Sequence, residues 1–224
     1  MTKINIKQYM SLGKFIQRQR MIQEQLVEND IQDQRVLDAF LAIPRHIFVP
    51  LEAEQRAYND GPLPIGFSQT ISQPYVVALM LESLKLKPHH HILEIGSGSG
   101  YVLALLSLLC KKVVGVELEK SLVSRSIETI RNLGLKNITV FHGDGYLGWE
   151  NRAPYDRILL SAAPAEFPRE LLGQLKADGL LIAPIGANEQ ELHLFWQKKG
   201  EWKSKVITEV RFVPLRKEKA IRPD

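Results

Sequence analysis

Between positions 91 and 109, an apolar run, a glycine-rich loop and a second apolar run follow one another. We expect a strand from His91 to Ile95 and a helix that begins at Tyr101. The loop between them carries Gly96, Gly98 and Gly100. Because glycine allows positive φ and close approach of the backbone to another group, this loop predicts a ligand site at the carboxyl end of the strand.

Strands and helices alternate through the rest of the chain, which predicts an α/β fold with a doubly wound, Rossmann-like sheet. Most of this sheet should be parallel. A turn at 198–201 separates two final strand patterns and predicts an antiparallel hairpin at one edge. The expected strands are Lys112 to Val116, Ile138 to His142, Tyr155 to Ser161, Gly179 to Pro184, Glu191 to Gln197 and Trp202 to Pro214, and the expected helices are Tyr101 to Leu109, Lys120 to Leu133 and Pro168 to Leu175.

The region before the sheet has a different character. Apolar spacing predicts helices from Gln8 to Asn29 and from Asp33 to Ala42. Glycines and prolines in the segment from Tyr58 to Gln73 predict a loop. A third helix should follow with Ser72 as its N-cap and run to about Leu84. We therefore expect one domain, with residues 1–87 as a helical extension and loop, and 88–224 as the sheet core.

The glycine spacing distinguishes between two classes of cofactor. A dinucleotide fingerprint, G-x-G-x-x-G, would need its third glycine at 101, where Tyr101 would obstruct the pyrophosphate. Here the glycines alternate and Glu94 precedes them, a spacing that resembles the first motif of S-adenosylmethionine enzymes. Ser97 lies within this loop and belongs to the expected cofactor site. A nucleotide site and a purely structural turn remain the alternatives.

The next two strands also end in suitable residues. Glu117 closes the second strand, where an acid can accept hydrogen bonds from both ribose hydroxyls; alternatively, it is an exposed acid or lies in the first turn of a helix. Asp144 follows the third strand and could accept from an adenine amino group, with Gly145 leaving room for the ring. The alternative for this pair is a simple Asp-Gly turn. Together, the three strand ends predict one cofactor site.

At this point the sequence resembles a known family. Residues 58–75, YNDGPLPIGFSQTISQPY, are similar to the hallmark loop of protein-L-isoaspartate O-methyltransferases. The resemblance covers roughly residues 15 to 216, and the block from Gln69 to Ser72 is specific to this family. Other blocks match in the same order: Arg45 to Pro50, Leu93 to Tyr101, Gly143 to Gly145, Ala162 to Pro164 and Arg211 to Leu215.

The resemblance implies methyl transfer from S-adenosylmethionine to the α-carboxylate of isoaspartyl residues in aged proteins and peptides, a repair activity. It assigns the catalytic role to Ser72. The cofactor site would also include Gln69, Thr70, Ile71, Ser72 and Tyr75. The substrate site would include Asp60, Ile65, Thr70, Ile71 and Ser72, although Asp60 could instead hold the turn at 61–62. Ser68 departs from the glycine found in many relatives, which puts the geometry of this loop in question.

Composition bounds the remaining possibilities. The chain has 224 residues, 45% of them hydrophobic, and a net charge of +4, which is no signature of a nucleic-acid partner. No apolar stretch approaches the ~20 residues that span a membrane, and the first eight residues lack a signal-peptide core. Cys110 lies in an apolar run and should be a buried small residue. We therefore expect a cytoplasmic monomer that binds neither nucleic acid nor a membrane and whose partners are its substrates, isoaspartyl-containing proteins or peptides.

Other functions are also weighed. The histidines at 89–91 have no Cys or acid pair at ligand spacing, so no metal site is expected. A methyltransferase acting on amines of RNA or small molecules would carry Asn/Asp-Pro-Pro after the fourth strand, where this chain has Ser161-Ala162-Ala163-Pro164. A cofactor-binding protein without activity is the third hypothesis. Ser72 and Glu117 are both present, which argues against it.

Overall fold

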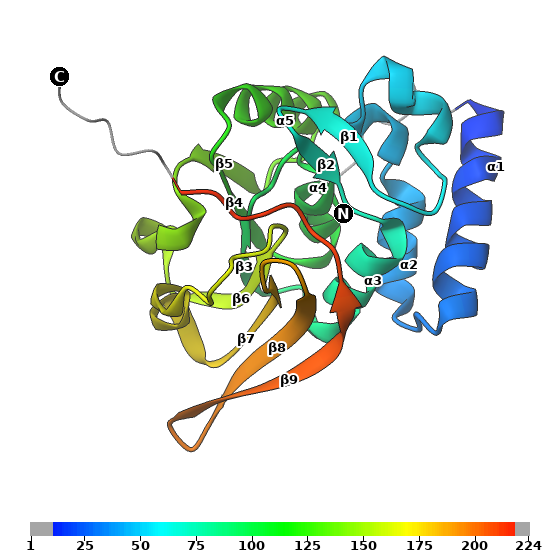
Figure 1. Ribbon diagram of the computed structural model, residues 1–224. Helices are drawn as coiled ribbons and strands as arrows, with labels where there is room; N and C mark the ends of the chain where they lie inside the picture. The colour runs from blue at the N-terminus through cyan, green and yellow to red at the C-terminus, as the bar shows by residue number, and fades with distance from the viewer. Residues whose placement is uncertain (1–10, 218–224) are drawn as a thin grey trace, which may run out of the picture.

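A seven-stranded sheet runs through the computed structural model, which describes residues 11–217 (Figure 1). Its strand order is β5-β4-β3-β6-β7-β8-β9. Neighbours from β5 to β7 are parallel, whereas β8 is antiparallel to both β7 and β9. This arrangement confirms the predicted fold class and edge hairpin. The bounds are β3 His91–Ile95, β4 Lys112–Glu117, β5 Ile138–His142, β6 Tyr155–Leu160, β7 Leu175–Ile185, β8 Gln190–Lys198 and β9 Glu201–Val210.

The chain changes direction in the sheet at β3. From β3 it continues through β4 to β5 at one edge, and then returns to place β6 on the other side of β3. In open α/β sheets, ligands bind outside the carboxyl ends of the strands at such a switch point. The topology therefore places a candidate crevice after β3 and β6, where the glycine loop begins.

Both faces of the sheet are buried. Along β3, Ile92 packs into a core shared with the α-helices, whereas Leu93 and Ile95 pack into a second core on the other face. The helices of the first face are α2 Gln34–Ala42, α3 Pro74–Ser83, α4 Tyr101–Leu109 and α5 Lys120–Asn132. The second face is covered by short 3₁₀ segments, η6 Gly145–Leu147, η7 Glu150–Arg152 and η8 Arg169–Gln174. The α-helix expected from Pro168 to Leu175 is therefore wrong in type.

The first helix is less regular than expected. It comprises α1 Leu12–Met21, a π-helical turn η2 Ile22–Leu26 and a 3₁₀ turn η3 Val27–Asn29. Ser11 caps it through a hydrogen bond from the Lys14 amide. The predicted start at Gln8 lies outside the described residues. No helix within residues 11–217 has the length and apolar character that crossing a membrane requires.

The loop expected from Tyr58 to Gln73 contains a β-hairpin, so that prediction is wrong in part. Its strands are β1 Leu63–Gly66 and β2 Gln69–Ile71, which pair antiparallel. Phe67 and Ser68 join them with φ of 55° and 57°. Two consecutive residues with positive φ are typical of a type I′ turn, whose twist matches that of a hairpin. Ser68 thus adopts the left-handed conformation although it is not glycine.

The helix that follows the hairpin also begins later than predicted. Its N-cap is Gln73, no side chain caps it, and Pro74 occupies the first turn. Proline fits this position because its missing N–H would have no partner there. Ser72 was expected to be the N-cap, and this is wrong: it lies in the short connection between β2 and α3.

After β9, the chain crosses the carboxyl edge of the sheet as a strap, which we define as residues 211–217 (Figure 1). The strand expected to reach Pro214 ends at Val210 because the strap pairs elsewhere. Ala163 donates its amide to the Val213 carbonyl at 2.9 Å and accepts from the Leu215 amide at 2.8 Å. The buried Gln190 side chain bonds both backbone groups of Phe212, at 2.6 and 3.1 Å.

Gln190→Leu should lower the free energy of unfolding by about 1–3 kcal/mol, because both backbone groups of Phe212 lose their partner in a partly buried setting. Urea unfolding measures this change. Gln197→Leu is the control, since its side chain bonds Gly200 at the exposed hairpin tip, and it should cost less than about 0.5 kcal/mol. Equal losses in both variants would contradict the anchoring role of Gln190.

Candidate functional site

A hollow of about 480 Å³ lies at the carboxyl edge of the sheet, where β3, β4 and β6 end. Four separate parts of the chain form its walls: the hairpin, the strand ends, Gly145 and the strap. The lining residues are Gln69, Thr70, Gly96, Gly98, Val116, Glu117, Leu118, Gly145, Ser161, Ala162, Val213, Pro214, Leu215 and Arg216.

The glycine loop allows two close approaches at this hollow. A Cβ at Gly96 would lie 3.3 Å from the Cβ of Ala162, which follows β6. A Cβ at Gly98 would lie 3.2 Å from Cδ1 of Ile65, on the hairpin. Both glycines also have positive φ, 74° and 52°. A side chain at either position would therefore be strained and would push a wall of the hollow outward.

Glu117 holds the glycine loop in place from the end of β4. One carboxylate oxygen accepts from the Gly98 amide at 2.8 Å, and the other accepts from the Glu119 amide at 2.9 Å. The side chain is buried, yet it lines the hollow. Each carboxylate oxygen has a second lone pair, so the group can still accept from ligand hydroxyls. This geometry fits the ribose role predicted for Glu117.

Glu94 lies behind the same loop and is 1% exposed. Its Oε1 accepts from the Ser161 hydroxyl at 2.7 Å, whereas its Oε2 has no partner among the described residues. Burial, opposed by the Ser161 hydrogen bond and assisted by the nearby Glu117 carboxylate, raises the pKa of Glu94 to about 8. The Ser97 hydroxyl is also buried without a partner. Buried polar atoms need hydrogen-bond partners, so this part of the site is suited to a bound group that offers donors or positive charge.

Six of the predicted cofactor residues share the hollow. They come from three segments that are far apart in the sequence: the hairpin, the strand ends and the turn after β5. The structure brings these residues together: Gln69, Thr70, Gly96, Gly98, Glu117 and Gly145.

Other predicted residues lie close to the hollow but outside its lining. Ile71 ends β2, and Ser72 and Tyr75 follow it. Ile65 is fully buried against Gly98. The roles of these residues, and those of Glu94 and Ser97, stay predictions.

Asp144 and Asp60 face different surroundings. The Asp144 side chain accepts from the Tyr146 amide at 2.9 Å and lines a neighbouring groove above η7 and η8. Asp60 accepts from the Gln73 side chain at 2.7 Å and lines a groove beside α1. Asp60 is therefore next in space to the connection that carries Ser72, and its substrate role also stays a prediction.

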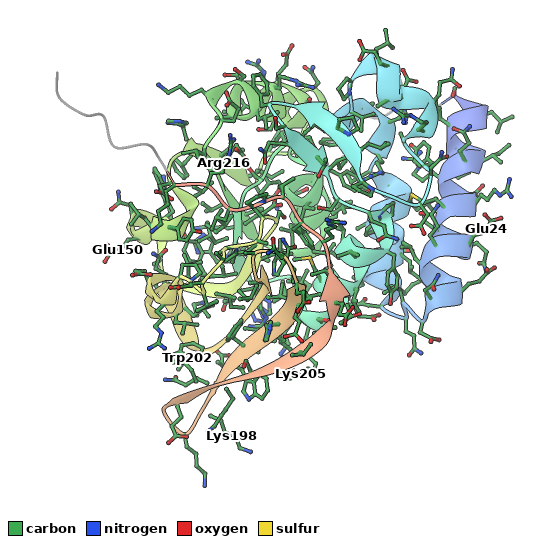
Figure 2. The ribbon with its side chains drawn as sticks, in the orientation of Figure 1. Glu24, Glu150, Lys198, Trp202, Lys205 and Arg216 are labelled. Atoms are coloured by element: carbon green, nitrogen blue, oxygen red, sulfur yellow. The ribbon has the colours of Figure 1, made fainter. Side chains whose placement is uncertain are left out.

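Sequence reasoning missed the residues that close the hollow from above. Ser161 and Ala162 follow β6, and Val213 to Arg216 belong to the strap. Figure 2 shows Arg216 beside the strap at the sheet edge, whereas Trp202 lies on the β8–β9 hairpin at the far end. The sequence blocks at 162–164 and 211–215 are similar to the family, and this similarity could have indicated that these residues belong to the site.

The model of the protein-L-isoaspartate(D-aspartate) O-methyltransferase family matches residues 16–220. The chain belongs to this family. The protein-L-isoaspartate O-methyltransferase of Herpetosiphon aurantiacus is 46% identical over 200 residues, which are 89% of each chain. For the present chain, the family and the enzyme class that the sequence predicted are thereby confirmed.

Solved structures of the family agree with the fold. A protein-L-isoaspartate O-methyltransferase has a TM-score of 0.80 at 30% identity over 88% of this chain, which spans 65% of that chain's length. The Plasmodium falciparum member, solved in complex with S-adenosyl-L-homocysteine, has a TM-score of 0.79 at 27% identity. The match covers 90% of this chain and 99% of that one. The predicted Rossmann-like architecture is confirmed.

The buried acid should give the protein a specific pH dependence. The unfolded chain loses the Glu94 proton near pH 4.5, whereas the folded chain keeps it up to about pH 8. The stability that this proton contributes is therefore complete below pH 4.5 and is lost as pH rises toward 8. Glu94→Gln cannot ionise, so between these pH values it should gain more than about 1 kcal/mol relative to wild type.

Urea unfolding at pH 4.5 and pH 8, without cofactor, measures this difference. Glu128→Gln is the matched control because Glu128 is exposed on α5, and its difference from wild type should change little with pH. A Glu94→Gln difference that is the same at both pH values would show that Glu94 titrates normally in the folded chain.

Proposed function

We propose that this chain transfers a methyl group from S-adenosylmethionine to the α-carboxylate of L-isoaspartyl residues in damaged proteins and peptides. One observation carries the proposal: Gln69 and Thr70, from the family-specific block at 69–72, line the same hollow as Gly98 and Glu117. Membership of the family supports the same reaction.

The chain offers suitable groups for each part of the cofactor. Glu117 would accept from the ribose hydroxyls, and Gly96 and Gly98 would bring the backbone close to the ligand. Gly145 would leave room for the adenine, with Asp144 as acceptor for its amino group. Glu94 and Ser97 offer partnerless polar atoms behind the loop. When bound, S-adenosylmethionine supplies a methyl group on a positively charged sulfur.

The substrate carboxylate needs no general base. A carboxyl group with an ordinary pKa near about 4 is already ionised at neutral pH. The task of the chain is therefore to orient this oxygen and to exclude water. Ser72 follows directly on β2, and its side chain does not cap α3. We infer that its hydroxyl donates to one carboxylate oxygen and leaves the other free to attack.

The hairpin and the strap act as the walls that keep water out. Thr70 comes from the hairpin, and Val213 to Arg216 come from the strap on the opposite side. The strap is fixed by the backbone pairing with Ala163 and by the Gln190 side chain. Exclusion of water strengthens electrostatic interactions inside a closed site, which suits a reaction between an anion and a cation.

We extend the proposal to the cellular compartment, the partners and the oligomeric state of the enzyme. Burial raises the pKa of Cys110 to about 12, which fits the inert small residue expected from the sequence and an enzyme of a reducing compartment such as the cytoplasm. Isoaspartyl polypeptides would be its partners. A monomer that does not bind nucleic acid remains the expectation, and light scattering on the purified protein checks the oligomeric state.

Ser72→Ala should lower turnover of an isoaspartyl peptide by about 10- to 100-fold, the loss expected for a hydrogen bond to a charged group. The melting temperature should change by less than about 2 °C, because Ser72 does not cap α3. Ser124→Ala is the control, since Ser124 lies exposed on α5, and it should keep wild-type turnover. Wild-type turnover in Ser72→Ala would rule out the catalytic assignment.

Methyl-labelled cofactor and two peptides that differ only in an isoaspartyl or an aspartyl linkage test the function itself. Only the isoaspartyl peptide should gain a methyl ester, which base treatment releases. Equal labelling of both peptides, or of neither, would refute the proposal. Labelling of RNA or of a small-molecule amine would favour the second class of methyltransferase considered from the sequence.

A further inference from the structure

The β1–β2 hairpin contains an irregularity at Ile65. Pro64 pairs with Thr70 and Gly66 pairs with Gln69, and the register shifts between these two pairs. Ile65 therefore stands opposite no residue of β2, as in a β-bulge. A bulged residue is left out of the local ladder, so its backbone groups need other partners.

The Ile65 carbonyl finds its partner on a helix of the sheet core. Arg125, on α5, donates from Nη1 to this oxygen at 3.0 Å. The same nitrogen would lie 3.9 Å from a Cβ at Gly66, so the guanidinium lies alongside the bulge. Figure 1 shows α5 next to β1, although the two are about sixty residues apart in the sequence.

The Ile65 side chain connects to the same half of the molecule. It is fully buried, and its Cδ1 meets the position that a Cβ would take at Gly98. The bulge thus turns the side chain of one residue onto the glycine loop and its carbonyl toward α5. Gln69 and Thr70, on the second strand of the hairpin, line the hollow. The two contacts of Ile65 therefore help to fix the position of these residues relative to the site.

The hairpin is also held at its base. Asp60 and Gln73, which precede and follow the two strands, are joined by a hydrogen bond of 2.7 Å. At the other end, the turn at Phe67 and Ser68 is exposed, and Gln69 bonds the Phe67 carbonyl within the tip. Between base and tip, Arg125 joins the hairpin to the core. Three buried hairpin side chains also pack into the core: Leu63, Ile65 and Ile71. Opening of the hairpin about its base must therefore break both this packing and the charged tether, so loss of the tether makes opening easier.

We propose that Arg125 is a positioning residue that holds the hairpin closed over the hollow through the Ile65 carbonyl. Arg125 touches neither reactant. It acts by keeping Gln69, Thr70 and the Ser72 connection against the glycine loop. When the tether is lost, the hairpin opens more often, and both the cofactor product and the peptide bind more weakly. The kinetic part of this inference rests on the proposed function, whereas the tether itself does not.

Arg125→Met removes the donors and keeps most of the aliphatic length, and Arg125→Lys restores a donor. Arg131→Met is the matched control, because Arg131 is exposed on the same helix. Without added cofactor, amide hydrogen exchange across residues 63–71 should be about five- to tenfold faster in Arg125→Met, since the local opening free energy falls with the lost hydrogen bond. Exchange in Arg125→Lys should lie between that of Arg125→Met and that of the unchanged protein, and Arg131→Met should match the unchanged protein.

Two further measurements separate positioning from mere structural support. In Arg125→Met, the Kd of S-adenosylhomocysteine from calorimetry and the KM of an isoaspartyl peptide should each rise about fivefold, while kcat at saturation stays within about twofold. The melting temperature should change little, because Arg125 is exposed and the substitution removes one hydrogen bond while the buried side chains of the hairpin stay in place.

Unchanged hairpin exchange in Arg125→Met would overturn the proposal, because the hairpin would then not depend on the tether. Faster exchange with unchanged Kd and KM would also overturn it, because the tether would then have no effect on the site. If the unchanged protein failed to methylate an isoaspartyl peptide, the proposed function would fall, while the exchange and calorimetric comparisons would still decide the role of Arg125.

Discussion

The contact between the glycine loop and its neighbours determines the geometry of the whole site. Gly96 and Gly98 let Ala162 and Ile65 approach to distances that a side chain would block. The Glu117 carboxylate fixes the same loop through the Gly98 amide. These contacts join the end of β3 to β4, to β6 and to the hairpin. The shape of the hollow therefore depends on the close backbone packing that Gly96 and Gly98 allow.

The features that the sequence predicted well are those written in local patterns. The bounds of β3, α4 and β5 match the prediction residue for residue, since each is a mostly apolar segment between clear breaks. The glycine spacing and Glu117 identified the cofactor side of the site for the same reason: each follows directly on a strand end. The edge hairpin was evident from its turn at 198–201.

The features that the sequence did not predict depend on contacts between distant residues. The glycines and prolines from Tyr58 to Gln73 predict a loop because they break regular patterns. A left-handed turn at Phe67 and Ser68 nevertheless lets residues 63–71 pair as a hairpin. Nothing local in the segment after Val210 indicates that it pairs with Ala163. In the sequence, Arg125 looks like an ordinary exposed residue of a helix. Its hydrogen bond to the Ile65 carbonyl depends on the bulge in β1, which the sequence does not predict. The division at residue 87 stays a prediction, although the hollow has walls from both sides of it.

The strap gives ligand binding an effect that reaches far beyond the site. The hollow is bounded by Gln69 and Thr70 on one side and by Val213 to Arg216 on the other, so a molecule held there bridges segments separated by more than a hundred residues. Any ligand that binds only the folded chain adds its binding free energy to stability. In this fold, ligand binding would therefore stabilise both the hairpin and the strap. Fraying after β9 would therefore weaken affinity even with every residue of the glycine loop in place.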